Sequence, residues 1–566
     1  MKTLRLFILF CFVVSSFAQT VRPPFPVKRQ ETPATWQRDG WRALERARNE
    51  KIRKGKAKNV ILFIGDGMGV STLTAARILE GQIRGESGEE NRLSFEEFPF
   101  TALSKTYSID HQVSESASTM TAIIAGIKTD EGVLAVNQNA NRGDYKSAIG
   151  NQIKTLLEMS EEKGLSTGVV TTTRITHATP AACYAHTPER DWESDKDIFD
   201  RAKDAYEAKF PDIARQLIEF PYGDGLEVAL GGGRGKFLPK ETHDPEYDDQ
   251  TGERLDKRNL TQEWLKKNNS AYAWNKQQFD AIDVKKTKRL LGLFEPSHMQ
   301  FEHDRPKDKA GEPSLSEMTA KAIDILSQNK RGYFLMVEGG RIDHGHHNGN
   351  AFRALTEAIE LSNAVRTAEG KVNLDETLIV VTADHSHTLT IHGYPMRGNN
   401  ILGLVRQVDD NGHPEADYKR DRLGLPTTTL NYANGRGYTG ASNEQPAGPK
   451  KCCEEPKTFK AATGRPDLST IDTTDPDYLQ EVIAPLRSET HSGEDVAIFA
   501  TGVNAYLVHG SMEENWIFYV MADALGFKQN IKQYWRRSGG KLRRRQFSEP
   551  KARLSAQNSG FAQKSL

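Results

Sequence analysis

Four short segments of the sequence combine carboxylates with histidines or glycines. Mixed carboxylate and imidazole ligands are typical of zinc sites, whereas carboxylate and hydroxyl oxygens are preferred by magnesium. Any one of these histidines, taken alone, is equally explained as an ordinary surface or core residue. Four such segments together predict a metal centre. They are residues 65–67 around Asp66, residues 338–347, residues 384–387 and residues 490–495.

The second segment has a spacing that suits one ion. Asp343 and His347 are four residues apart. If the chain turns helically after Asp343, both side chains project from the same helix face. The spacing therefore predicts that these two residues bind one metal ion.

Ser116 is the candidate nucleophile. It precedes a run of small residues that is predicted to be helical, and a helix N-terminus offers free N–H groups to a phosphate. A nearby metal ion can deprotonate a serine hydroxyl. Because small-residue helix starts are common, the prediction for Ser116 depends on the metal-binding segments.

The elements that must position these residues are short, continuous apolar runs. Each run is followed by polar residues or glycine, with helical periodicity between runs, as after residue 70. This pattern predicts an α/β fold with a mostly parallel central sheet covered by helices on both faces. Most candidate site residues follow the carboxyl ends of predicted strands, where open α/β sheets bind ligands. The predicted strands are residues 60–64, 166–173, 333–337, 378–382 and 496–500.

The length of 566 residues accommodates one large domain with insertions. We predict an N-terminal arm at 19–58, a main domain at 59–530 with insertions at about 240–312 and 393–465, and a basic polar tail at 531–566. Lys plus Arg and Asp plus Glu number 76 each, so bulk charge does not indicate a nucleic-acid partner. The tail is interpreted as solvated, with attachment to an anionic surface as the alternative.

Residues 1–18 have a basic start, an apolar stretch and small residues before Gln19, which is typical of a signal peptide. The alternative is a membrane anchor, but the run is shorter than the ~20 apolar residues of a span. The C-terminus lacks the hydrophobic tail of a GPI signal. The sequence therefore predicts a secreted, extracellular protein, and the sequons at Asn259 and Asn268 would allow glycosylation. After cleavage, Cys183, Cys452 and Cys453 remain, so one thiol is free or two pair.

These motifs resemble the alkaline phosphatases, and in particular the animal, tissue-type enzymes. The resemblance runs from about residue 41 to about residue 525. Three motifs carry it with high specificity: Glu-Gly-Gly-Arg-Ile-Asp-His-Gly-His-His from residue 338, Thr-Ala-Asp-His-Ser-His from residue 382, and Thr-Thr-Thr-Arg-Ile-Thr-His-Ala-Thr-Pro-Ala from residue 171. The family's metal-binding and crown-like subdomains would correspond to the two insertions.

The resemblance implies hydrolysis of phosphate monoesters through a phosphoserine on Ser116, with Arg190 gripping two phosphate oxygens. It implies two zinc ions and one magnesium ion, with His177 near the magnesium and His387 orienting the zinc ligands. It also implies a homodimer in which the N-terminal arm and residues 393–465 contact the partner. The implied ligands are Asp343, His347 and His491 for the first zinc, Asp66, Asp384 and His385 for the second, and Asp66, Thr179 and Glu338 for magnesium.

The animal members of the family also bind calcium. The matching positions here include Glu312 where the family has Asp, and the spacing after Glu295 is two residues longer than in the family. Surface acids are the alternative interpretation. The implied calcium ligands are Glu246, Phe294 through its carbonyl, Glu295 and Glu312.

The sequence departs from the family around the nucleophile, where the family has Asp-Ser-Ala-Gly-Thr-Ala-Thr. Glu115 replaces the Asp that orients the arginine, and Ser118 and Met120 replace smaller residues. We therefore predict an active enzyme with altered turnover or phosphate affinity, in which Glu115 positions Arg190. Two other classes are a two-metal phosphodiesterase or sulfatase, and a non-catalytic protein that binds phosphate or mineral.

Overall fold

The computed structural model describes residue 25, residues 31–439, residue 451 and residues 465–527. The predicted signal peptide at 1–18, the basic tail at 531–566, Cys452 and Cys453 lie outside the described residues. Met1–Leu525 form one unit and Gly526–Leu566 a second.

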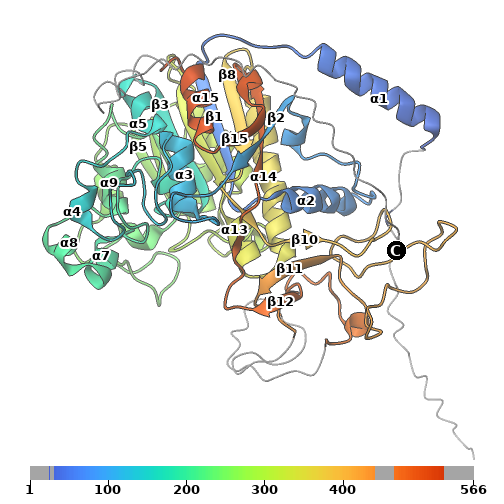
Figure 1. The fold of residues 1–566 in the computed structure, drawn as a ribbon. Helices are drawn as coiled ribbons and strands as arrows, with labels where there is room; N and C mark the ends of the chain where they lie inside the picture. Colours follow the sequence, from blue (N-terminus) through green and yellow to red (C-terminus); the bar gives the residue numbers. More distant parts are fainter. Residues whose placement is uncertain (1–24, 26–30, 440–450, 452–464, 528–566) are drawn as a thin grey trace, which may run out of the picture. The chain divides into compact units, whose positions relative to one another are not determined.

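A ten-stranded sheet forms the centre of the first unit (Figure 1). All neighbouring strands are parallel except β14, which runs antiparallel to both β2 and β8. The sheet confirms the predicted α/β class. In spatial order its strands are β15 (Gly510–Glu513), β2 (Phe100–Lys105), β14 (Val496–Gly502), β8 (Thr377–Thr382), β1 (Asn59–Gly65), β7 (Tyr333–Gly339), β3 (Ser166–Arg174), β4 (Val228–Gly232), β6 (Arg289–Leu293) and β5 (Ser270–Ala273).

All five strands expected from apolar runs are present, as β1, β3, β7, β8 and β14. Their central residues are buried, except for the half-buried Phe499 of β14, and this burial explains why their sequences are continuously apolar. The strands that the apolar runs did not indicate are short, glycine-containing or half-exposed. Two of them, β5 and β6, come from the region 240–312 that was expected to be an insertion, so part of that region completes the sheet edge.

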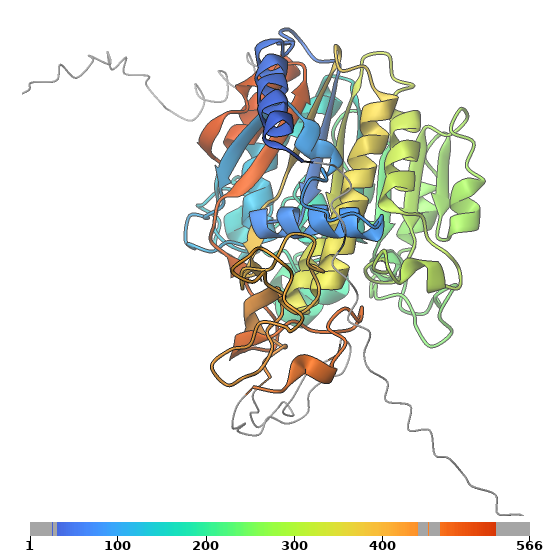
Figure 2. The ribbon, with the colours of Figure 1, turned by 90° about the vertical axis from the view of Figure 1, so that its right-hand side faces the viewer.

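Helices cover both faces of the sheet. Figure 1 shows α3 and α5 on one side and α2 and α14 on the other, and Figure 2 shows α14 lying over the sheet. Apolar side chains on α12 and α14 pack against strand residues in one large core cluster. The helices of the first face are α3 (Ser116–Ala125), α5 (Leu156–Glu162), α6 (Ala178–Ala181) and α15 (Trp516–Ala524), and those of the second are α2 (Val70–Ile83), α12 (Leu315–Leu326) and α14 (Ala351–Lys371).

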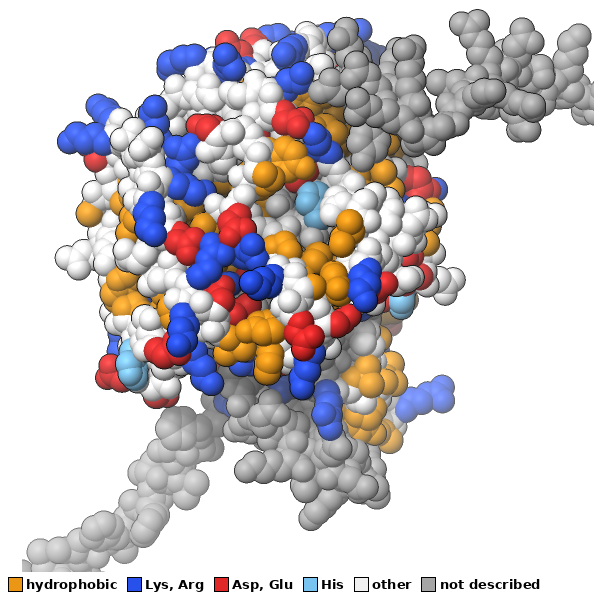
Figure 3. Space-filling model, turned by 90° about the vertical axis from the view of Figure 1, so that its left-hand side faces the viewer, with side chains coloured by type: hydrophobic (Ala, Val, Ile, Leu, Met, Phe, Trp, Pro, Cys, Tyr) orange, Lys and Arg blue, Asp and Glu red, His pale blue; other side chains and the backbone are white. Residues whose placement is uncertain are grey.

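Shorter elements connect these layers. They comprise α4 (Tyr145–Ala148), α7 (Asp195–Arg201), α8 (Lys203–Glu207), α9 (Ile213–Ile218), α10 (Leu260–Trp264), α11 (Lys276–Asp280) and α13 (Arg341–His347), and the 3-10 turns η1 (Ser94–Glu97), η2 (Arg234–Phe237), η3 (Arg305–Lys307), η4 (Leu468–Thr470) and η5 (Ala505–Leu507). One face of the molecule carries basic and acidic side chains interspersed (Figure 3), so it presents no broad region of one charge.

Two small sheets lie beyond the carboxyl ends of the central strands. One contains β10 (Thr390–Ile391), β11 (Leu430–Gly435) and β12 (Val482–Pro485), and the other pairs β9 (Ser386–His387) with β13 (His491–Ser492). In the arm region, α1 (Pro33–Arg48) has no buried residue. In the described part of the chain, no helix combines the length and apolar character needed to cross a membrane.

Candidate active site

The carboxyl ends of three adjacent central strands bring the acidic residues together. In β1, Ile64 lies beside Glu338 of β7 and beside Thr382 of β8. Asp66 and Asp384 follow two residues beyond Ile64 and Thr382. Because β1 is flanked by both neighbours, the three carboxylates converge at one edge of the sheet, as the sequence predicted.

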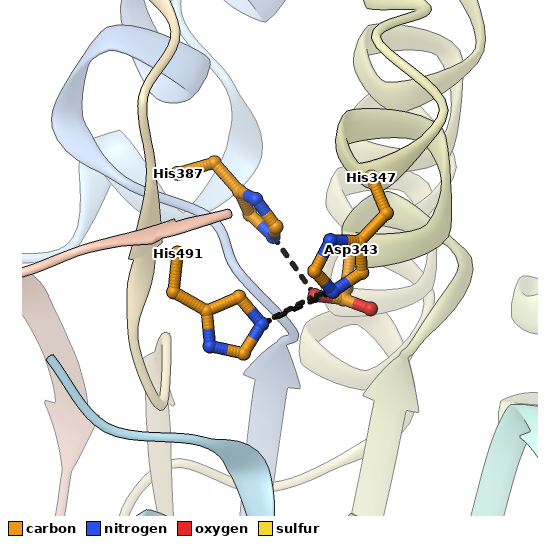
Figure 4. A group of neighbouring side chains, drawn as sticks. All are labelled: Asp343, His347, His387 and His491. Carbon is orange, nitrogen blue, oxygen red and sulfur yellow. Dashed lines mark hydrogen bonds and ion pairs between the residues drawn. The ribbon is translucent and has the colours of Figure 1, made fainter. Parts of the chain in front are cut away.

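The first cluster consists of one carboxylate and three imidazoles. Figure 4 shows His347 of α13, His387 of β9 and His491 of β13 directed toward Asp343. Oδ1 of Asp343 lies 2.8 Å from Nε2 of His387, 3.2 Å from Nε2 of His347 and 3.3 Å from Nε2 of His491. The helical spacing of Asp343 and His347 was predicted, and the β9–β13 pairing, with His491 opposite His387, completes the cluster.

Main-chain carbonyls fix the tautomers of two of these rings. Nδ1 of His347 lies 2.6 Å from the Glu489 carbonyl oxygen, and Nδ1 of His491 lies 2.7 Å from the Ser114 carbonyl oxygen. A carbonyl only accepts, so both Nδ1 atoms carry the proton and both Nε2 atoms present lone pairs. These two Nε2 atoms are 3.1 Å apart. Two facing lone pairs beside a carboxylate fit a bound cation, and this donor set suits zinc.

The second cluster surrounds the candidate nucleophile. Nε2 of His385 lies 3.3 Å from Oδ1 of Asp66 and 3.4 Å from Oδ2 of Asp384. Ser116 Oγ lies 3.2 Å from that same nitrogen and 3.5 Å from Oδ1 of Asp66. All four side chains are buried. The hydroxyl therefore faces the donor atoms that could hold one ion.

A third group combines oxygen donors. Asp66, His177 and Glu338 lie together, and Thr179 is the second residue of the short helix α6, whose N-cap is His177. Oγ1 of Thr179 and Oε1 of Glu338 are buried without a hydrogen-bond partner, as is Oδ2 of Asp66. Buried polar atoms normally have partners. Three such oxygens fit a hard cation such as magnesium.

The pKa values of the clustered carboxylates also favour bound cations. Burial raises the pKa of Asp66 well above its ordinary value, and repulsion from Asp384 adds to the rise. Burial also raises the pKa of Glu338 to about 7 and that of Asp384 to about 6. Charged carboxylates packed this closely require compensating positive charge. The residues present therefore fit bound cations.

Glu115 connects the nucleophile helix to Arg190. As the N-cap of α3 it accepts hydrogen bonds from the N–H groups of Ala117 and Ser118, each at 3.0 Å, and from Gly132 N at 2.8 Å. Its Oε2 also binds Nη1 of Arg190. Burial raises the pKa of Glu115, but Arg190 and the three N–H groups outweigh it and lower the pKa overall. Glu115 is thus an ionised cap that holds a guanidinium.

Arg190 has a second fixed contact. Its Nη2 lies 3.2 Å from Nε2 of His177, so both ends of the guanidinium fork are oriented by neighbours. The side chain is mostly buried and lies near Asp66, whose charge also acts on it. A planar fork held in this way suits bidentate binding of an oxyanion.

The two other departures near Ser116 are accommodated in the structure. Ser118 Oγ lies 2.7 Å from Ser114 Oγ, and it donates to the Glu115 carbonyl oxygen at 3.1 Å. Met120 is completely buried. The Ser118 hydroxyl therefore pairs with that of Ser114, and the Met120 side chain packs in the core.

Two of the four predicted calcium ligands lie in a separate acidic cluster. Glu246 and Glu295 lie within one group together with Asp308, a residue that the sequence did not indicate. Glu312 accepts a hydrogen bond from Gln300 N at 2.8 Å, and burial, followed by repulsion from Glu295, raises its pKa to about 9. Phe294, which directly precedes Glu295 in the sequence, is buried. Side-chain oxygens of Glu246, Asp308 and Glu312 are buried without a hydrogen-bond partner.

The two sequons differ in their surroundings. Asn259 is the N-cap of α10, where its side chain accepts hydrogen bonds from Gln262 N at 3.1 Å and from Thr261 Oγ1 at 2.7 Å. Asn268 is exposed. Among the described residues, Cys183 is a buried free cysteine.

The sequence as a whole matches one family of enzymes. The sequence model described as alkaline phosphatase matches residues 57–527. The alkaline phosphatase of Gadus morhua is 43% identical over 514 residues, which are 89% of this chain and 99% of the cod protein. The tissue-nonspecific isozymes of Gallus gallus and Homo sapiens are 42% and 40% identical, over 91% and 92% of this chain and 93% and 94% of those proteins.

Solved structures share the fold. The alkaline phosphatase of the Antarctic bacterium TAB5 superposes with a TM-score of 0.53 at 22% identity, covering 84% of this chain and 99% of that one. The Thermus thermophilus alkaline phosphatase superposes with a TM-score of 0.57 at 22% identity, covering 85% and 93%. At this identity the likeness establishes the architecture.

Proposed function

The chain belongs to the alkaline phosphatase family of metal-dependent phosphomonoesterases, and on that premise we propose that it hydrolyses phosphate monoesters through a phosphoserine on Ser116. The observation that carries the proposal is the position of Ser116 Oγ, 3.2 Å from Nε2 of His385 and 3.5 Å from Oδ1 of Asp66. A serine hydroxyl buried among metal-ligating atoms is the arrangement an activated nucleophile requires.

The chain's own residues then have distinct tasks. Ser116 is the first residue of α3, so its oxygen lies at the N-terminal end of the helix, where the helix dipole favours an anion such as phosphate. The N–H groups of Ala117 and Ser118 in the same turn bind Glu115. Arg190, held by Glu115 and His177, binds phosphate oxygens through its fork. Bound metal ions would supply the positive charge that lowers the pKa of the Ser116 hydroxyl and stabilises the leaving oxygen. Because all these groups address the phosphate, we expect broad specificity for the alcohol.

The donor sets support an assignment of the ions. Imidazole-rich sets suit zinc, and the all-oxygen set suits magnesium. We assign the first zinc to Asp343, His347 and His491, the second zinc to Asp66, Asp384 and His385, and the magnesium to Asp66, Thr179 and Glu338. The cluster of Glu246, Glu295 and Asp308, with Glu312 and the Phe294 carbonyl, is assigned to calcium.

Hydrolysis of p-nitrophenyl phosphate tests this function. We expect turnover at alkaline pH that EDTA abolishes and zinc plus magnesium restore. Ser116→Ala removes the nucleophilic oxygen and should reduce turnover to the background of the assay. Activity that survives both EDTA and Ser116→Ala would contradict the mechanism.

We further propose that the protein is a secreted glycoprotein that forms a homodimer. The helix α1 supports the dimer, because it exposes Trp36, Trp41 and Leu44 and buries none of its residues. Sedimentation of the purified protein, with and without residues 31–48, tests this assembly. For the glycan, the exposed Asn268 is a better acceptor than Asn259, whose amide is engaged as a helix cap. Peptide mapping after enzymatic deglycosylation distinguishes the two.

A further inference from the structure

Glu489 is a buried carboxylate to which the proposed mechanism gives no task. It lies two residues before His491 and is 1% exposed. Its Oε2 lies 2.5 Å from Nδ1 of His387. Its Oε1 accepts from Thr388 N at 2.7 Å and from Thr388 Oγ1 at 2.6 Å.

The main chain of Glu489 engages a second imidazole. Its carbonyl oxygen accepts from Nδ1 of His347 at 2.6 Å, and its N–H donates to the His347 carbonyl oxygen at 3.0 Å. One residue therefore holds both His347 and His387, which come from different elements and whose Nε2 atoms both face Asp343.

The position of Glu489 is itself enforced by close packing. Gly435, at the end of β11, has φ +127°, and a Cβ placed there would lie 3.0 Å from the Cβ of Glu489. That distance is shorter than ordinary contacts, so a glycine at this position gives the Glu489 side chain its space. The carboxylate is thus fixed both by its donors and by the backbone beside it.

We propose that Glu489 is a positioning residue that fixes the ring orientations of His347 and His387 and thereby determines the affinity of the first zinc site. This inference rests on the proposed function, because His347 is assigned there as a ligand of the first zinc and His387 binds Asp343, another ligand of the same zinc. Hydrogen-bond partners of ligating histidines and carboxylates fix the orientation of those ligands, and loss of such partners typically lowers metal affinity by ~10–100-fold. The side chain of Glu489 acts on the carboxylate ligand Asp343 through His387.

The role requires a carboxylate and not merely a polar side chain of similar shape. Both oxygens of Glu489 accept from N–H or O–H donors. A glutamine that turns its NH₂ group toward Thr388 N would place two donors opposite each other. One that turns it toward His387 Nδ1 would require this nitrogen to accept a hydrogen bond instead of donating one. Glu489→Gln therefore keeps the side-chain volume and the main-chain hydrogen bond to His347. It disrupts the side-chain hydrogen bond to either His387 or Thr388.

Glu494 provides a matched control on the same pair of strands. It accepts from Ser386 Oγ at 2.7 Å and also binds Ser492, so it connects β9 with β13 without contacting an imidazole in the described structure. Glu494→Gln perturbs the same β9–β13 pair by the same chemical change. A general effect of weakening this pair would appear in both variants.

Zinc titration of the full-length protein tests the proposal without measuring turnover. Wild type, Glu489→Gln and Glu494→Gln are stripped by a chelator and titrated with Zn²⁺ in competition with a chromophoric chelator. We expect two tight sites in wild type and in Glu494→Gln. In Glu489→Gln one site should weaken by ~10–100-fold while the other is retained. Far-UV circular dichroism of the stripped proteins checks that each variant is folded.

The zinc titration distinguishes failure of the Glu489 role from failure of the proposed zinc-dependent function. If wild type binds two zinc ions and Glu489→Gln binds both with unchanged affinity, Glu489 does not position the site. If Glu489→Gln and Glu494→Gln weaken zinc binding equally, the effect belongs to the strand pair and the proposal is overturned. A wild-type protein that binds no zinc would overturn the proposed function itself. If Glu489→Gln does not fold, Thr388→Val replaces it, because this change removes one hydrogen bond to Oε1 of Glu489. Unchanged zinc affinity in Thr388→Val would contradict the positioning role of Glu489.

Discussion

Glu115 binds Arg190 across 75 residues of sequence while it caps the helix that begins with Ser116. Two groups that act on the same phosphate are therefore tied to one carboxylate. The Glu115 side chain binds the guanidinium and the N–H groups of the helix together. The departure from the family pattern is compatible with a working site.

Glu115→Asp tests this link. The shorter side chain can still cap α3, as Asp commonly does, but its carboxylate retracts from Arg190. A displacement of ~1 Å in a site of this kind can change the rate by ~10²-fold. We expect kcat and the inhibition constant of inorganic phosphate both to change, by about 10-fold or more. Steady-state kinetics that match wild type in both would show that Glu115 does not tune Arg190.

The hydroxyl pair of Ser114 and Ser118 stabilises the segment before the nucleophile. Ser118→Ala leaves a buried hydroxyl without its partner, which costs ~1–3 kcal/mol. Removing both hydroxyls should cost less than the sum of the single changes. Denaturant unfolding of the two single variants and the double variant measures the coupling. Strictly additive effects would contradict the pairing.

Met120 fills the core beneath the nucleophile helix. Because the side chain is fully buried, Met120→Ala should create a cavity and lower the free energy of unfolding by ~2–5 kcal/mol. Met120→Leu conserves the volume and should cost less than ~1.5 kcal/mol. Denaturant unfolding of both variants checks the difference. Equal stability of Met120→Ala and wild type would exclude a packing role.

Asp308 should contribute to calcium binding. After chelation, added calcium is expected to raise the Tm of the wild type, because a ligand that binds the folded state stabilises it. Asp308→Asn removes a charged ligand from the cluster and should greatly reduce that rise. Differential scanning calorimetry measures the rise in Tm. Asp280→Asn, the same change at an exposed aspartate, is the control. A full calcium response in Asp308→Asn would remove this residue from the site.

Glu161 should make the protein less stable at alkaline pH. Burial, followed by repulsion from Glu227, raises the pKa of Glu161 to about 9. The folded state therefore binds a proton that the unfolded state releases above its ordinary pKa, so stability falls as pH rises toward 9. Glu161→Gln should flatten this dependence by up to about 1.4 kcal/mol per pH unit. Unfolding followed from pH 6 to pH 9 measures the slope, and parallel curves for the two proteins would contradict the assignment.

The sequence by itself determined the features that depend on local pattern. Continuous apolar runs indicated the buried central strands, because a strand covered on both faces needs apolar residues at every position. The four-residue spacing of Asp343 and His347 indicated one helix face, and that helix is present as α13. The strands β5 and β6 were not indicated. The edge strand β5 has four residues and no continuous apolar run, and β6, its neighbour, has five residues with Gly292 interrupting its leucines.

Only the tertiary structure decided which distant groups meet. Glu489 reaches His387 across 102 residues of sequence through the pairing of β13 with β9. Asp308 lies in one group with Glu295 and with Glu246, which is distant from it in the sequence. Such contacts depend on strand register and loop closure, which no short-range periodicity encodes. The sequence therefore indicated most of the candidate metal ligands, while the fold shows which residues hydrogen-bond to them.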